Sequence, residues 1–164
     1  MISLGCAKNL VDAEIMLGSL VKEGVEITND AASADVVIVN TCSFIDAAQE
    51  ESVDAILESA QVREAQNRGQ GLIVSGCLPQ RFQEELPKLL PEVDAFMGVD
   101  QVAQINEIVQ KAMVHRSERV ATEAITGKKA GRKKVLNRLA ELDQKRARIR
   151  ITNTPLLLLF RSMT

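Results

Sequence analysis

Aromatic residues are almost absent from this sequence of 164 residues, which has four Phe and neither Trp nor Tyr. Proteins that bind single-stranded nucleic acid usually stack its bases on aromatic side chains, so this composition disfavours a base-stacking RNA-binding domain. The hydrophobic fraction is nevertheless 46%. A folded core must therefore be built mainly from aliphatic side chains.

Long apolar runs and a disulfide framework are also missing. The apolar run at residues 156–160 is far shorter than the roughly 20 residues that cross a bilayer. No basic and then apolar leader follows Met1. An odd number of three widely spaced cysteines does not suit a secreted disulfide scaffold. We expect a cytoplasmic protein without a membrane partner, in which thiolates remain free to bind metal.

Charge is divided unevenly along the chain. Residues 1–114 hold 7 Lys and Arg against 18 Asp and Glu, a net charge of −11, whereas residues 115–164 hold 13 against 4, a net charge of +9. This division predicts an acidic folded domain over residues 1–114 and a basic, largely irregular extension over residues 115–164. The stretch Gly127–Lys134 could contact RNA phosphates, although a solvated linker is the more ordinary interpretation.

Short β-branched runs alternate with helical patterns over the first 112 residues. The predicted strands are Ile2–Leu4, Val25–Thr28, Asp35–Val39, Gly71–Ser75 and Asp94–Met97. The predicted helices are Asn9–Lys22, with Leu10, Ala13, Leu17 and Leu20 on its apolar face, then Asp46–Gln66, Pro79–Leu86, Gln101–Ala112 and, in the extension, Val135–Leu142. The alternation predicts an α/β fold with an open parallel sheet flanked by helices, either flavodoxin-like or Rossmann-like.

Each cysteine directly follows a strand-forming run. ISLGC ends at Cys6, VVIVNTC at Cys42 and LIVSGC at Cys77. In an open parallel sheet the loops that follow the strands lie along one edge, the carboxyl edge, where such folds bind ligands. The separations of 36 and 35 residues are close to one or two crossover units. The three thiols therefore converge if their strands are neighbours.

Three thiolates can hold a 4Fe-4S cluster at three of its irons and leave the fourth iron open, whereas four cysteines are the usual ligand set. Gly5 and Gly76 directly precede Cys6 and Cys77. Glycine permits tight turns and a close approach of the backbone to a bulky group. We therefore predict that Cys6, Cys42 and Cys77 are the ligands of one iron–sulfur cluster.

Other interpretations of these residues stay open. Buried free cysteines often serve only as small hydrophobic side chains. His115, the one histidine, could complete a zinc site or a catalytic Cys–His pair, although it lies among basic residues. Asp12 and Glu14 are interpreted as charges at the beginning of a helix. The motifs GxxxxGK(S/T) and GxGxxG do not occur in the sequence, so no nucleotide-phosphate site is predicted.

Four sequence blocks together resemble the motifs of a known family. They are SLGCAKNLVDAE (residues 3–14), NTCSFIDAAQEESVDAILE (residues 40–58), SGCLPQRF (residues 75–82) and LPEVDAFMGVDQV (residues 90–102). Over about residues 2–112 the chain resembles the N-terminal domain of the radical-SAM methylthiotransferases. Within that group it resembles the RimO type, which modifies an aspartate of a small-subunit ribosomal protein. The tRNA-modifying type, the nearest alternative, typically has Gln and Asn after its first cysteine.

The resemblance implies an auxiliary 4Fe-4S cluster on Cys6, Cys42 and Cys77. The open iron of that cluster is thought to hold the sulfur species that becomes the methylthio group. In the complete family enzyme a second 4Fe-4S cluster, in a radical-SAM barrel, cleaves S-adenosylmethionine to a radical that abstracts hydrogen from the substrate. A small C-terminal domain helps to engage the ribosomal protein. No DNA partner is implied.

The chain also departs from this family. The barrel motif CxxxCxxC is absent, and no cysteine follows Cys77. RARIRIT (residues 146–152) resembles the lead-in to the barrel, but LLLLFRSMT (residues 156–164) fits nothing in the family. The first strand lacks the few residues that normally precede it. We interpret the chain as an incomplete gene product (a fragment, a frameshifted copy or a mispredicted reading frame) that is not catalytic alone.

Two hypotheses from other classes remain. One is a non-enzymatic, flavodoxin-like binding module whose basic tail docks on ribosomal RNA. It predicts salt-sensitive RNA binding that is lost when residues 115–164 are deleted. The other is a nonfunctional relic that folds poorly.

Overall fold

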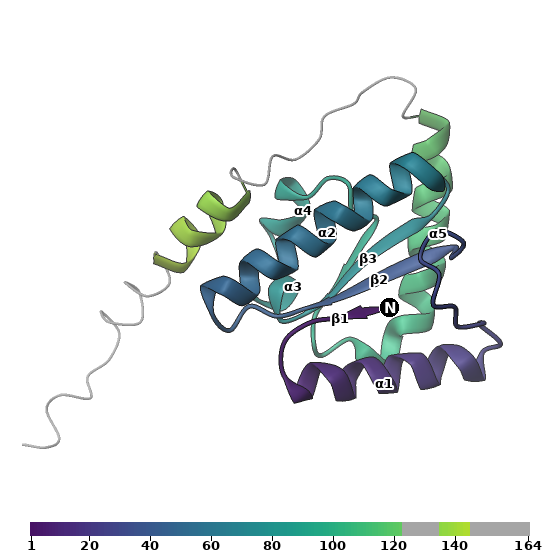
Figure 1. Cartoon of the computed structure of the whole chain (residues 1–164), viewed down its shortest axis with the longest axis horizontal. Helices are drawn as coiled ribbons and strands as arrows, with labels where there is room; N and C mark the ends of the chain where they lie inside the picture. Colours follow the sequence, from purple (N-terminus) through teal and green to yellow (C-terminus); the bar gives the residue numbers. More distant parts are fainter. Residues whose placement is uncertain (123–134, 145–164) are drawn as a thin grey trace, which may run out of the picture.

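A four-stranded parallel sheet forms the centre of the molecule, in the order β1–β2–β3–β4. The structure, a computed structural model, describes residues 1–122 and 135–144 (Figure 1). The strands are β1 (Ile2–Ser3), β2 (Val36–Thr41), β3 (Gly71–Gly76) and β4 (Ala95–Met97). The two long strands at the centre of the sheet contain continuous apolar runs, VVIV in β2 and LIV in β3, as expected of parallel strands that are covered on both faces. The predicted α/β fold is confirmed.

Helices cover both faces of this sheet. They are α1 (Ala7–Lys22), α2 (Asp46–Gln66), α3 (Cys77–Arg81), α4 (Leu86–Leu89) and α5 (Ile105–Thr122), with the short 3-10 helix η1 (Val102–Gln104) before α5. A further helical segment spans residues 135–144. Among the described residues no helix combines the length and the hydrophobicity of a membrane span.

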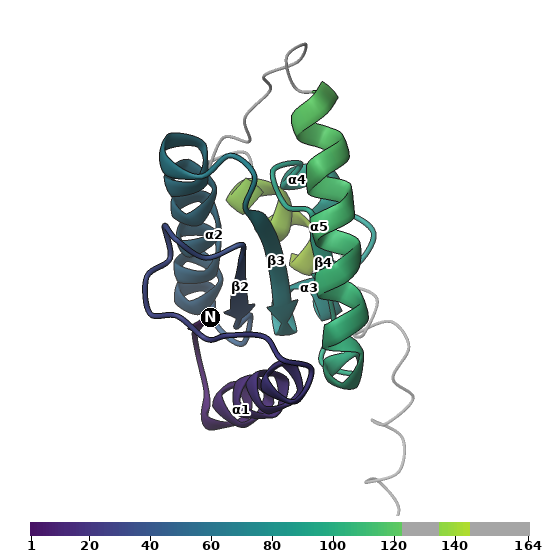
Figure 2. The ribbon, with the colours of Figure 1, turned by 90° about the vertical axis from the view of Figure 1, so that its right-hand side faces the viewer.

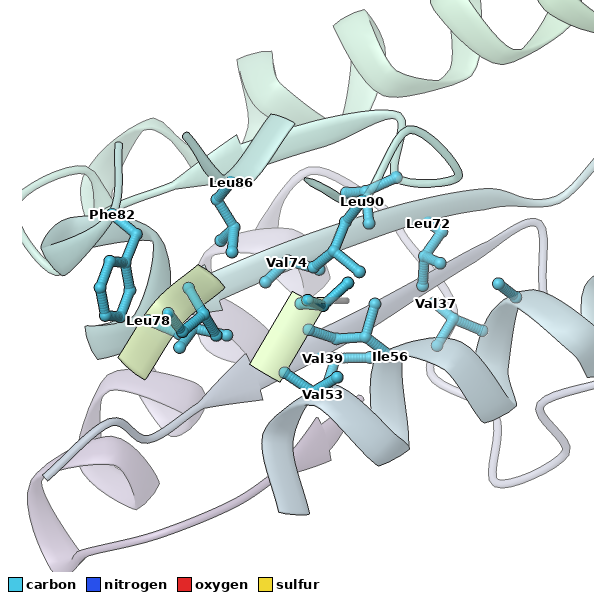
Figure 3. Packing of buried hydrophobic residues seen from close by; sticks show 14 residues of the cluster. Val37, Val39, Val53, Ile56, Leu72, Val74, Leu78, Phe82, Leu86 and Leu90 are labelled. Atoms are coloured by element: carbon cyan, nitrogen blue, oxygen red, sulfur yellow. The ribbon is translucent and has the colours of Figure 1, made fainter. Parts of the chain in front are cut away.

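Alternate residues of β2 and β3 point to two separate cores, as the two-residue period of a strand requires. Val39 and Val74 pack with α2 and with the chain around α3 and α4, which Figure 3 shows from close by. Ile38 and Ile73 pack on the other face with α1 and α5. Figure 2 accordingly shows α2 and α5 on opposite sides of β2 and β3.

A buried ion-pair network closes the amino edge of the sheet. The carboxylate of Asp94, directly before β4, accepts hydrogen bonds from Arg63 Nη1 at 2.8 Å, from the backbone N–H of Leu72 at 2.8 Å and from Arg119 Nη1 at 3.3 Å. Arg116 is also fully buried and pairs with Glu64 at 3.2 Å. These arginines carry positive charge into the folded domain.

Two predicted elements differ from the structure near the first helix. Val25–Thr28 is not a strand, because the edge strand β1 has only two residues and offers little backbone to pair with. The buried face of α1 consists of Asn9, Ala13, Met16 and Leu20. Leu10 is instead 55% exposed, so the predicted apolar face of this helix is wrong by part of a turn.

The predicted helices near and after residue 79 also differ in extent. The single helix predicted at Pro79–Leu86 is two short helices, α3 and α4, separated by a turn. Helix α5 continues to Thr122 rather than ending at Ala112, because its polar Arg116 and Arg119 are paired inside the fold.

Part of the predicted irregular extension belongs to the fold. Residues 135–144 are helical, which confirms the short helix predicted there. Val135 and Leu139 of this segment are buried in the same core as α2. The stretch Gly127–Lys134 and residues 145–164 lie outside the described residues.

Candidate metal centre

The three cysteines lie at the carboxyl edge of three adjacent strands. In the sheet register Ser3 of β1 is opposite Asn40 of β2, and Asn40 is opposite Ser75 of β3. Cys6 lies three residues beyond this row, and Cys42 and Cys77 each lie two residues beyond it. The strands are parallel, so all three chains leave the sheet on the same side. The predicted convergence on one edge is therefore present in the structure.

The three thiols have different surroundings. Cys6 is exposed and occupies the N-cap position of α1, where the backbone N–H groups of Asn9 and Lys8 lower the pKa of its thiol. Cys77 is half-buried at the first position of α3. Its burial, and after that the neighbouring thiols of Cys42 and Cys6, raise its pKa. The edge thus holds one thiol with a lowered pKa and one with a raised pKa.

Cys42 is buried and its backbone is held rigidly. Its N–H donates to Ser52 Oγ at 3.1 Å, and the Ser52 hydroxyl donates to the Cys42 carbonyl at 2.9 Å. One serine of α2 therefore satisfies both backbone groups of this cysteine. These two hydrogen bonds tie the beginning of the loop after β2 to α2.

Two glycines allow the cysteine loops to approach each other. Gly5 has φ +93°, and a Cβ there would lie 2.4 Å from Cys42 Cβ and 2.8 Å from Cys42 Sγ. Gly76 has φ +98°, and a Cβ there would lie 2.4 Å from Thr41 O. Both positions combine a left-handed backbone with no room for a side chain. The close approach here is between neighbouring loops, Gly5 to Cys42 and Gly76 to Thr41.

A layer of polar side chains lies beneath the cysteines, and sequence reasoning missed it. Asn9, Asn40, Thr41 and Ser75 are all almost completely buried. The Thr41 hydroxyl donates to Ser75 O at 2.6 Å, and Asn40 Nδ2 donates to Asn9 O at 2.7 Å. The signal that was available is the run of polar residues at the ends of otherwise apolar strands, NT after VVIV and S after LIV.

His115 is excluded as a partner of these cysteines. Its Nδ1 lies 3.1 Å from the carbonyl oxygen of Asp94. Asp94 directly precedes β4, so this contact is at the amino edge of the sheet, opposite the thiols. Both the zinc site completed by His115 and the catalytic Cys–His pair are therefore ruled out by position.

The donors gathered at this edge are three thiols. Within residues 1–122 and 135–144, no three His, Cys, Asp or Glu side chains converge on a point that would hold one metal ion. A 4Fe-4S cluster attaches each thiolate to a different iron, so its sulfur ligands stand further apart than those of one ion. Three thiols form a soft donor set, which suits iron–sulfur ligation.

Comparison with known proteins identifies the family of this domain. Residues 1–98 match the family described as "Uncharacterized protein family UPF0004". The chain belongs to this family. The UPF0004 match runs from β1 through β4 and contains Cys6, Cys42 and Cys77.

Curated relatives of this UPF0004 chain carry the name "Ribosomal protein uS12 methylthiotransferase RimO". The protein from Akkermansia muciniphila is 56% identical over 115 residues, which are 69% of this chain and 25% of the relative. The protein from Pelobacter propionicus is 59% identical over 109 residues, which are 66% and 24% of the two chains. The protein from Geobacter sulfurreducens is 57% identical over 111 residues, which are 68% and 25%. The resemblance to the RimO type is confirmed, and the chain spans about a quarter of the length of these relatives.

The helical segment at residues 135–144 reaches the cysteine edge of the UPF0004 domain. Asp143 forms an ion pair with Arg81 at 2.8 Å and accepts a hydrogen bond from Gln49 Nε2 at 3.1 Å. Arg81 Nη1 in turn donates to the carbonyl of Ser43, the residue after Cys42, at 2.6 Å. This segment therefore braces the loop that carries Cys42.

Proposed function

We propose that Cys6, Cys42 and Cys77 bind a 4Fe-4S cluster and that this domain serves a methylthiotransferase that modifies ribosomal protein uS12. The observation that carries the proposal is the position of three thiols at the carboxyl ends of three neighbouring parallel strands. The UPF0004 match and the names of the relatives support it from outside the structure. An RNA-binding module would not require the three cysteines to meet at one edge of the sheet.

The residues of this chain fit such a cluster in three respects. The N–H groups at the beginning of α1 stabilise a thiolate at Cys6. Ser52 fixes the backbone of Cys42, and Gly5 and Gly76 let the ligand loops come together. When bound through three cysteines, the cluster would keep one iron open to carry the sulfur that the reaction transfers. The protein's contribution at this edge is to hold the ligands and to leave that fourth position free.

The remaining chemistry would be supplied outside this sequence. A second 4Fe-4S cluster and S-adenosylmethionine would generate the radical, and a CxxxCxxC motif for that cluster does not occur among the 164 residues. Since the chain covers about a quarter of its relatives, we expect no turnover from it alone. The uS12 protein would be the substrate of the complete enzyme.

The RNA-binding alternatives gain little support. Arg116 and Arg119, two basic residues of the predicted extension, are occupied by ion pairs with Glu64 and Asp94. The lysine-rich stretch Gly127–Lys134 lies outside the described residues, so an RNA contact there stays a prediction. The three relatives described above are all named for a ribosomal protein, which favours a protein substrate over tRNA.

Anaerobic reconstitution tests the cluster assignment directly. The protein, incubated with iron and sulfide, should develop the broad visible absorbance of a 4Fe-4S cluster. Cys6→Ala, Cys42→Ala and Cys77→Ala should each lose most of this absorbance and of the bound iron. Phe44→Ala is a suitable control, since Phe44 is 89% exposed and lies only two residues from Cys42. Full iron content in all three cysteine variants would overturn the assignment.

A further inference from the structure

Asn9 is a polar residue with no exposed surface. It lies in the first turn of α1, on the face that packs against the sheet. Burial of a side-chain amide is costly unless its donors and acceptor find partners inside the protein. The hydrogen-bond partners of Asn9 therefore indicate the structural role of its side chain.

The amide nitrogen of Asn9 joins two cysteine loops. Nδ2 donates to Leu4 O at 2.9 Å and to Thr41 O at 2.8 Å. Leu4 lies two residues before Cys6, and Thr41 directly precedes Cys42. A flipped amide would place its oxygen against both carbonyl oxygens, so these two contacts fix the orientation of the side chain.

The same orientation directs the amide oxygen of Asn9 toward the third cysteine. The Cys77 thiol donates to Asn9 Oδ1 across 3.8 Å between sulfur and oxygen. This contact belongs to the metal-free protein, because a thiolate bound to iron has no proton to donate. One side chain thus touches all three segments of the proposed ligand set, which lie 36 and 35 residues apart in the sequence.

Asn40 holds the backbone of Asn9 in place. Its Nδ2 donates to Asn9 O at 2.7 Å, and its Oδ1 accepts from the Ser75 hydroxyl at 3.3 Å. The beginning of α1 is therefore tied to β2 and, through Asn40, to β3. The side-chain amide of Asn9 therefore extends from a backbone that is itself hydrogen-bonded to the sheet.

We propose that Asn9 is a positioning residue that sets the spacing of the three cysteine loops before a cluster is bound. That Asn9 serves cluster binding rests on the proposed function, whereas its hydrogen bonds to the cysteine loops do not. Asn9 does not act as a ligand. It cross-links the loops on either side of the strand ends, so that the thiols stand ready without further rearrangement.

The test compares Asn9 variants with a matched asparagine. Asn9→Ala removes the amide, Asn9→Leu keeps the branched shape of the side chain without its donors and acceptor, and Asn9→Ser keeps a single hydroxyl. Asn106→Ala is the control, because Asn106 Nδ2 donates to Ser19 Oγ at 2.9 Å and so links α5 to α1 at a distance from the cysteines. All four variants are made in the full chain.

The first measurement uses metal-free protein and does not depend on any cluster. Hydrogen exchange of the peptides that contain residues 4–8 and 40–44 should rise together in Asn9→Ala and Asn9→Leu. Two lost hydrogen bonds of ordinary strength predict faster exchange on the order of tenfold. Asn106→Ala should leave both peptides unchanged. Unchanged exchange in the Asn9 variants would overturn the proposal, whether or not the wild type binds iron.

The second measurement follows iron loss from reconstituted protein to a chelator, at a temperature well below the melting point of every variant. Iron should leave Asn9→Ala and Asn9→Leu on the order of tenfold faster than the wild type. Asn9→Ser should lose iron at a rate between theirs and that of the wild type, and Asn106→Ala at the wild-type rate. Retention by Asn9→Leu equal to the wild type would mean that the residue only fills space, which would overturn the proposal. If the wild type itself binds no iron, the proposed function fails and the exchange measurement alone decides the role of Asn9.

Discussion

At the carboxyl edge, the absence of a side chain at two glycines matters as much as the hydroxyl of one serine. Gly76 has no Cβ to meet Thr41 O, and Gly5 has none to meet Cys42. Ser52 offers a hydroxyl short enough to serve both backbone groups of Cys42. These residues bind nothing themselves, yet each determines where a thiol stands.

Gly76→Ala should destabilise the domain measurably. The substitution forces a left-handed backbone on alanine and places its Cβ 2.4 Å from a carbonyl oxygen. We expect a loss of roughly 1–3 kcal/mol in the free energy of unfolding, measured by urea denaturation of the metal-free protein. Gly18→Ala is the matched control, because nothing lies within 4 Å of a Cβ at that helical position.

Gly18→Ala should be neutral or more stable by about 0.5–1 kcal/mol, because alanine suits a helix interior better than glycine. If Gly76→Ala unfolded at the same urea concentration as Gly18→Ala, the close approach at Thr41 would not constrain the fold.

Some of the residues at this edge could be predicted from the sequence and others could not. The cysteines and their glycines were found because each follows a β-branched run directly. Asn9 was missed because a search for apolar periodicity favoured Leu10, which is exposed. A buried asparagine gives no hydrophobic signal, and its partners lie on loops that are close only after folding.

At the scale of elements, the segment at residues 135–144 changes the extent of the domain. It follows a lysine-rich stretch and was assigned to a basic extension by charge. Its helix was nevertheless predictable, because Val135 and Leu139 have helical spacing. Their burial against α2 was not predictable, since nothing local indicates which core a short helix will join.

Leu139→Ala should therefore destabilise the domain even though the residue lies outside the UPF0004 match. Deletion of a buried leucine side chain typically costs about 2–5 kcal/mol, and a short peripheral helix that can adjust suggests the lower end. Thermal and urea unfolding of the full chain measure the change. Asn137→Ala, at an exposed position of the same segment, should remain within about 0.5 kcal/mol of the wild type. Equal stability of the two variants would show that the segment does not dock on the core in solution.

At the scale of the whole molecule, the two edges of the sheet carry different groups of side chains. The carboxyl edge carries the thiols, and the amino edge carries the network of Asp94, Arg63 and Arg119. The length of β2 and β3 separates the two edges, so a change at one should leave the local geometry of the other intact.

Asp94→Ala tests this separation. It leaves Arg63 buried without its carboxylate and removes the acceptor of the Leu72 N–H, so we expect a loss of about 3–5 kcal/mol in stability. Iron content after reconstitution, measured well below the melting temperature, should equal that of the wild type. Asp100→Ala, an exposed aspartate, is the control for stability. Loss of iron from folded Asp94→Ala would show that the edges are coupled.

The row formed by Ser3, Asn40 and Ser75 has a consequence for the order of events in the life of the chain. Its members are separated by 37 and 35 residues, so the row forms only after two long loops have closed, and sheets of this kind gather such distant contacts slowly. An unfolded or half-synthesised chain presents its thiols singly, with no common centre. The proposed cluster would therefore find its three ligands together only in the folded sheet, and its binding would in turn stabilise that fold.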